Sequence, residues 1–136
     1  MLNELLDSLA AVRKARGQAE ALLADYPQAE DLREAGESAI GRLTGWENLV
    51  TQTRYGTYED EDSMPPMLDV HIRHVLDVID HAGAPVSAGS LQRLVDLRAQ
   101  WQARKAELAA INASDIAALN AWARGHGVAY VTPPGE

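Results

Sequence analysis

The feature that most constrains the fold is the spacing of apolar side chains, which recur at steps of three and four residues along most of the chain. Such spacing places them on one face of an α-helix, because one turn takes 3.6 residues. Arg16 fills the one polar position of the first stripe, which otherwise consists of Leu2, Leu5, Leu9, Val12, Ala19 and Leu23. This stripe predicts an amphipathic helix over residues 2–24.

Three further stretches show the same spacing and predict helices over 28–53, 65–82 and 88–111. A short fifth helix is expected over 115–124, because Ser114 is a suitable N-cap residue, and the tail after it is expected to be extended. The sequence therefore predicts an all-α fold, an up-down-up-down antiparallel four-helix bundle with a short fifth C-terminal helix and an extended tail.

Two helix ends and one glycine-rich stripe carry further predictions. Ser87 or Ser90 is expected to cap the fourth helix, and Gly83 is expected to end the third helix in a left-handed conformation. Gly36, Gly41 and Gly45 lie in the second helix, where each glycine costs about 0.5–1 kcal/mol relative to alanine. Close approach of a neighbouring helix is the favoured explanation, and a groove for a ligand or partner is the alternative.

The size and the charge of the chain limit the classes of protein to which it can belong. With 136 residues, 46% of them hydrophobic, the chain fits one domain over 1–136 that buries a single core. Twenty acidic and twelve basic residues give a net charge of -8, which would repel a nucleic-acid backbone. No window approaches eighteen apolar residues, so membrane insertion is not expected. The chain has no cysteine, which removes disulfides and thiolate metal sites.

The stretch "RYGTYEDEDSMPP" predicts a long loop over 54–64 that interrupts the helical pattern. Its candidate interaction residues are two tyrosines and a run of four acids, namely Tyr55, Tyr58, Glu59, Asp60, Glu61 and Asp62. We expect the loop to present them to a neighbouring domain or partner protein. A calcium site is the alternative, but the acids are consecutive rather than at the alternate positions of the calcium-binding loop.

His74, Asp77 and His81 share one stripe of the third predicted helix and offer nitrogen and oxygen ligands for zinc. The stripe lies opposite the apolar seam, and no Glu-x-x-His motif accompanies it. Pairing of exposed charges, Asp77 with His81 and Arg73 with Asp77, is the favoured interpretation. We therefore assign no metal ligand and no cofactor.

Catalytic motifs are not found in the sequence. It contains no Gly-x-Ser-x-Gly elbow, no phosphate-binding glycine loop and no cysteine nucleophile. Trp46, Trp101 and Trp122 fall on apolar stripes, so we expect them in the core rather than as sugar-stacking platforms. We therefore do not expect the protein to be an enzyme, and we assign no catalytic residue.

A resemblance to a known family covers roughly the last two thirds of the chain. The residues that carry it are the Trp46-Glu47 pair with Leu49 and Gln52, followed by Asp60, Pro65 and Leu68. Two longer stretches come after these, "PVSAGSLQRLVDLRAQW" and "DIAALNAWARGHG". These resemble the C-terminal helical region of large bacterial sortilin-like proteins, which carry BNR or Asp-box repeats and are often described as glycosyl hydrolase-like.

The resemblance implies a non-catalytic accessory domain that follows a β-propeller, with the propeller as its partner. Self-association of the chain is the alternative partner interaction. Any glycan chemistry would belong to the propeller, whose Ser-x-Asp-x-Gly-x-Thr-Trp box is not found here. The compartment would be extracellular or periplasmic if the parent protein is exported, and cytoplasmic if the chain is complete as written. The alternatives are a stand-alone helical adaptor or regulator and a metal-binding bundle.

Overall fold

A computed structural model describes residues 1–136 except Tyr58, Ala84 and Glu136, and it leaves the side chains of Glu61 and Asp62 undescribed. The all-α prediction is confirmed, since the described residues form helices and no strand. In chain order the elements are α1 (Leu2–Asp25), α2 (Glu30–Val50), α3 (Asp60–Ser63), α4 (Leu68–Asp80), α5 (Ala88–Ile111), the π-helical turn η1 (Asn112–Ile116) and α6 (Ala117–His126).

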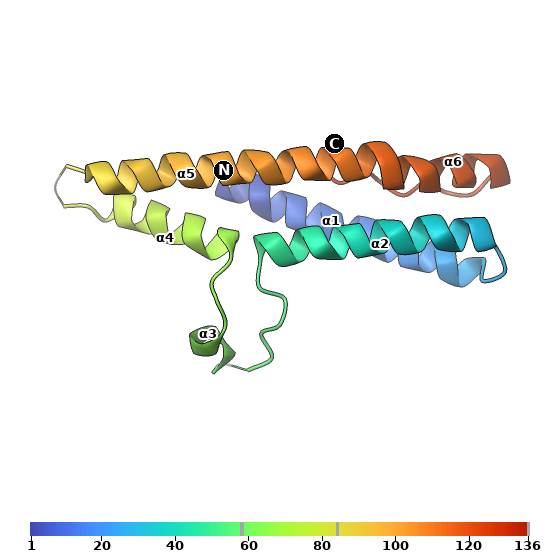
Figure 1. Ribbon diagram of the computed structural model, residues 1–136, viewed down its shortest axis with the longest axis horizontal. Coiled ribbons are helices and arrows are strands. Elements are labelled where there is room, and N and C mark those ends of the chain that lie inside the picture. Colours follow the sequence, from blue (N-terminus) through green and yellow to red (C-terminus); the bar gives the residue numbers. More distant parts are fainter. Residues whose placement is uncertain (58, 84, 136) are drawn as a thin grey trace.

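Helices α1 and α2 form an antiparallel hairpin (Figure 1). The buried apolar residues of both helices belong to one core. The predicted stripe of α1 is buried at its centre, from Leu5 to Ala19, whereas Leu2 and Leu23 at its ends are only partly buried. A methyl group added at Gly36 would meet the side chain of Leu23 at 2.6 Å, so the close approach expected for the glycines occurs there. Gly41 and Gly45 have no such neighbour within 4 Å among the described residues.

Helices α5 and α6 form one continuous rod through η1 (Figure 1). This corrects the predicted separate helix over 115–124, because Ser114 does not cap a new helix but lies within the π-helical turn. Its hydroxyl oxygen instead lies 2.8 Å from both the Ala110 carbonyl and Asp115 Oδ2, which share its one proton. No glycine or proline separates α5 from α6, so the backbone remains helical from Ala88 to His126.

The side-by-side packing of four helices predicted for the bundle is not confirmed. Helix α4 packs mainly on α5, whereas α2 packs on α5, η1 and α6, so α2 and α4 follow one another along the same rod (Figure 1). Helix α4 has 13 residues and rises only about 20 Å. It therefore accompanies only part of α5, and its far end lies beyond the N-terminus of α1.

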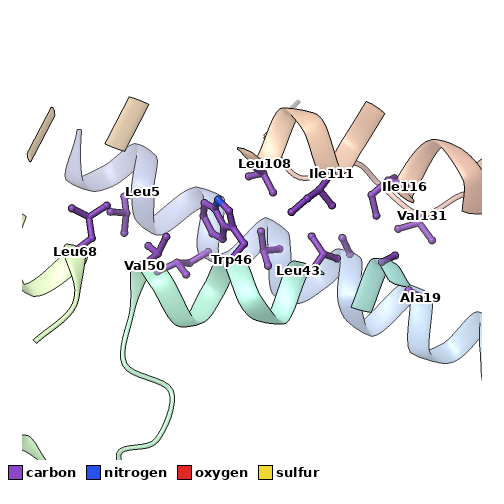
Figure 2. Packing of buried hydrophobic residues seen from close by; sticks show 14 of the residues in the cluster. Leu5, Ala19, Leu43, Trp46, Val50, Leu68, Leu108, Ile111, Ile116 and Val131 are labelled. Carbon is purple, nitrogen blue, oxygen red and sulfur yellow. The ribbon is translucent and has the colours of Figure 1, made fainter. Parts of the chain in front are cut away.

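The core joins the α1–α2 hairpin and α4 to the rod. Figure 2 shows Trp46 among Leu5, Val50 and Leu43, with Leu108 and Ile111 across from them. The rings of Trp46 and Trp101 lie 6.3 Å apart, and both are almost fully buried, as predicted. Their polar ends are satisfied, because Trp46 Nε1 donates to the Arg104 carbonyl at 2.7 Å and Trp101 Nε1 donates to Glu4 at 2.8 Å.

Trp122 departs from the core prediction, because it is only partly buried at the edge of the core. One of its faces stacks on His126 with ring centroids 3.9 Å apart, and Tyr26 meets it edge to face at 5.2 Å. The two neighbours cover the indole where the α1–α2 turn meets α6. Trp122 therefore packs the end of the rod rather than its centre.

Two predicted helices are shorter in the structure than the predictions based on proline and glycine indicated. The predicted helix 28–53 spans Glu30–Val50, and 65–82 spans Leu68–Asp80. Gly83 does not adopt a positive φ, and α4 ends instead at His81, whose backbone N–H bonds to the preceding turn. Ser87 caps α5 as predicted, accepting the Ser90 N–H at 3.1 Å.

Candidate interaction surface

The segment from residue 51 to residue 67 leaves the helical body between α2 and α4 and carries α3 at its far end (Figure 1). It extends the predicted loop 54–64 on both sides. Thr51 Oγ1 donates to Asp69 Oδ2 at 2.7 Å and Gln52 Nε2 to the Pro65 carbonyl at 3.4 Å, which ties the two ends together. We refer to residues 51–67 as the projecting segment.

The turn before α3 is built on Asp60, one of the predicted interaction residues. Its Oδ2 atom accepts the backbone N–H groups of Gly56 at 2.8 Å and Thr57 at 2.7 Å. These two hydrogen bonds lower the pKa of Asp60 below its usual value of 3.8, because they favour the charged carboxylate. Asp60 therefore shapes the segment.

The other predicted interaction residues have different outcomes. Tyr55 is 38% exposed, and Glu59 is also exposed. Tyr58 lies outside the described residues, and the structure does not describe the side chains of Glu61 and Asp62. A hollow of about 400 Å³ lies at the base of the segment, and its lining residues are Asn48, Gln52, Thr53, Arg54, Pro65 and Met67.

A buried carboxylate that the sequence analysis missed lies beside this base. Glu47 is 3% exposed and binds Arg13 Nε at 2.6 Å and Arg16 Nη1 at 2.5 Å. Burial raises the pKa of Glu47, but the hydrogen bonds from the two arginines outweigh it and hold the pKa below 4.5. Arg16 was visible in the sequence as the one polar residue of the first stripe, which was the signal for a buried partner.

A second buried carboxylate ties α2 to the π-helical turn. Asp115 binds Arg42, and it accepts a hydrogen bond from the Ser38 hydroxyl at 2.6 Å and from the Ser114 hydroxyl at 2.8 Å. Burial again raises the pKa, and the hydroxyl groups and Arg42 outweigh it, so the pKa of Asp115 lies below 3.8. Glu47 and Asp115 are thus charged, and both hold helices together.

The three residues weighed as zinc ligands are exposed on α4. His81 Nδ1 lies 3.1 Å from Asp77 Oδ1, which is the predicted charge pair, and His74 takes no part in it. The Asp77 carbonyl and then its carboxylate raise the pKa of His81. Across the described part of the chain, no three or more His, Asp or Glu side chains are placed to hold a metal ion.

No protein-family model, curated protein or solved structure matches the chain. Among the described helices, none has both the length and the apolar character needed to cross a bilayer.

Proposed function

We propose that the protein is a non-catalytic helical module that binds another protein through its projecting segment. The observation that carries this proposal is the combination of a fixed base, an internal turn on Asp60 and an exposed Tyr55 in a segment held away from the core. Connections longer than about 12–15 residues are uncommon in compact domains unless they are functional or disordered. A segment that already holds a turn loses less entropy when it binds.

The state of the buried acids supports a non-catalytic role. A general acid or base needs a pKa near the working pH, which usually requires a raised carboxylate pKa. Glu47 and Asp115 have lowered pKa values and arginine partners. Their chemistry is that of structural ion pairs.

A photo-crosslinking residue in place of Tyr55 tests the proposal in the source cells. We expect one discrete covalent adduct with a partner protein after irradiation. The matched control places the same residue at Gln102, an exposed residue of α5. Equal adduct patterns at both positions, or none at Tyr55, would contradict the assignment of the projecting segment as the binding surface.

The narrower proposal is that the chain forms the C-terminal accessory domain of a sortilin-like propeller protein, with the propeller as the partner. It rests on the sequence resemblance alone. An antibody against this chain should then detect a protein several times larger than 14.7 kDa in fractionated source cells. A band near 14.7 kDa would instead favour the stand-alone adaptor.

A further inference from the structure

The C-terminal tail after Gly127 lies in a groove between α1 and the α5–α6 rod. Three of its residues face inward at a constant step of three: Val128 is partly buried, and Val131 and Pro134 are almost fully buried. A repeat of three is the period of the polyproline II helix. This spacing places one side of the tail against the groove at every third residue.

Two amide side chains hold the backbone of this tail. Asn120 Nδ2 donates to the Val131 carbonyl at 2.9 Å, and Asn120 Oδ1 accepts the Val131 N–H at 2.8 Å. Gln18 accepts the Thr132 N–H at 2.8 Å and donates to the Thr132 hydroxyl at 3.4 Å. Bonds to the backbone of Val131 recognise an extended segment largely without regard to its side chains.

A third amide is only half used. Asn112 Nδ2 donates to the Pro134 carbonyl at 2.7 Å, but its buried Oδ1 accepts no hydrogen bond from any residue that the structure describes. At Asn120 the equivalent oxygen accepts a backbone N–H, and Pro134 has none to offer. The described part of the tail, up to Gly135, thus gives this acceptor of the groove no donor, which is costly in a buried site.

Open space continues on both sides of the tail. A hollow of about 240 Å³ adjoins Val128 and Val131, and one of about 570 Å³ adjoins Pro134. The second hollow includes Asn112 and the charged side chains of Glu4 and Lys105. A ligand larger than the tail can therefore be accommodated at either end.

We propose that this groove is a peptide-binding site and that the tail is its resident, replaceable ligand. The ligand is an extended segment of a partner protein with an apolar residue at every third position and a residue with an N–H at the place of Pro134. Such a segment makes every bond that the tail makes and supplies the donor that Asn112 lacks. The unused acceptor favours a partner over a second copy, whose tail would carry the same proline.

The tail also competes with any other segment that binds the groove. A tethered ligand competes at an effective concentration in the millimolar range, so it weakens the apparent affinity of any segment added in solution. Release of the tail should therefore expose the site. This consequence can be measured on the full chain.

The test uses fluorescently labelled peptides of residues 128–136 and full-length protein in which Val131→Asp releases the tail. We expect the peptide with Pro134→Ala to bind this variant at least tenfold tighter than the unchanged protein. We also expect it to bind about threefold to tenfold tighter than the unmodified peptide, as one added hydrogen bond predicts. A peptide with Val131→Asp should bind neither protein.

Two controls keep the test decisive. Ala129→Asp adds the same charge at an exposed tail position and should leave peptide binding as weak as in the unchanged protein. If Val131→Asp does not fold by circular dichroism, Thr132→Pro replaces it, because it removes both the N–H and the hydroxyl that bind Gln18.

Absence of saturable binding to a folded, tail-released variant would overturn the proposal. Failure of both variants to fold would do so too, because the tail would then be a fixed part of the core. Tighter binding of the unmodified peptide would overturn the choice of a partner and favour exchange of tails between copies.

Discussion

Two stretches outside the long helices behave differently in this molecule. The tail and the projecting segment each contain two prolines and at least one tyrosine. The tail is drawn into the protein at every third residue, whereas the projecting segment is tied mainly at its base. What differs is the surface beside each one: a groove with three amides receives the tail, and open solvent surrounds α3 (Figure 1).

Hydrogen bonds between side chains and the backbone span different distances along the sequence in the two regions. Asp60 accepts N–H groups three and four residues away, so its bonds order only the local turn. Gln18 holds a residue 114 positions away, and its bonds join the two ends of the chain. The bonds of Asp60 therefore order one turn, whereas those of Gln18 also hold two separate parts of the molecule together.

The largest test of this contrast is Asn120→Ala. It removes both bonds to Val131 and leaves two backbone groups without partners, so we expect the free energy of unfolding to fall by about 2 kcal/mol. Urea denaturation followed by circular dichroism measures the change. Asn3→Ala, at an exposed position of α1, is the control and should be nearly neutral. Equal effects would mean that the tail adds no stability.

Gln18→Ala should have a smaller effect of the same sign. Its bonds to Thr132 lie at the surface, where water can replace them, so we expect a loss of about 0.5–1 kcal/mol. The same urea measurement applies. A loss larger than that of Asn120→Ala would place the main attachment of the tail on α1 rather than on the rod.

Replacement of residues 54–64 by glycine and serine at equal length should change the unfolding free energy by less than about 0.5 kcal/mol. The length of the connection is kept, so the entropy of closing it stays similar. Thr51 and Asp69 also remain to join its ends. A large loss in thermal denaturation would show that the projecting segment is structural, and would count against its role as a binding surface.

The smallest effect is local and depends on pH. The folded pKa of Asp60 is lowered, so the turn is stable above pH 3.8 and is lost as the pH falls through that lowered pKa. The tail is held by amides, which do not titrate. Amide NMR shifts of Gly56 and Thr57 should therefore move in acid before those of Val131 and Thr132. Simultaneous movement, while circular dichroism is unchanged, would contradict this difference.

The helices could be predicted from the sequence because each has its own apolar stripe. The bounds of α1 agree within one residue, and α5 begins at the predicted residue, since Pro27 follows the end of α1 and Ser87 caps the start of α5. The arrangement could not be predicted, because a stripe shows that a helix has a partner but not which one. The continuity of α5 and α6 depends on η1, whose Asp115 binds a residue on α2.

The candidate sites show the same division. Tyr55 and Asp60 could be located in a loop from composition, but the turn on Asp60 depends on backbone geometry that no residue pattern specified. The tail was expected to be extended, yet its anchors come from α1 and the rod. Asn112, Asn120 and Gln18 look like ordinary polar helix residues until the folded chain brings them beside the tail.

The position of the projecting segment has a consequence for how the molecule could be divided. The projecting segment is the covalent link between the α1–α2 hairpin and the helices from α4 onward, while the core contacts between these two parts lie elsewhere. A single protease cut there would leave two fragments that share one hydrophobic core and stay together. The protein is therefore suited to fragment complementation, with each half completing the other only when both are present.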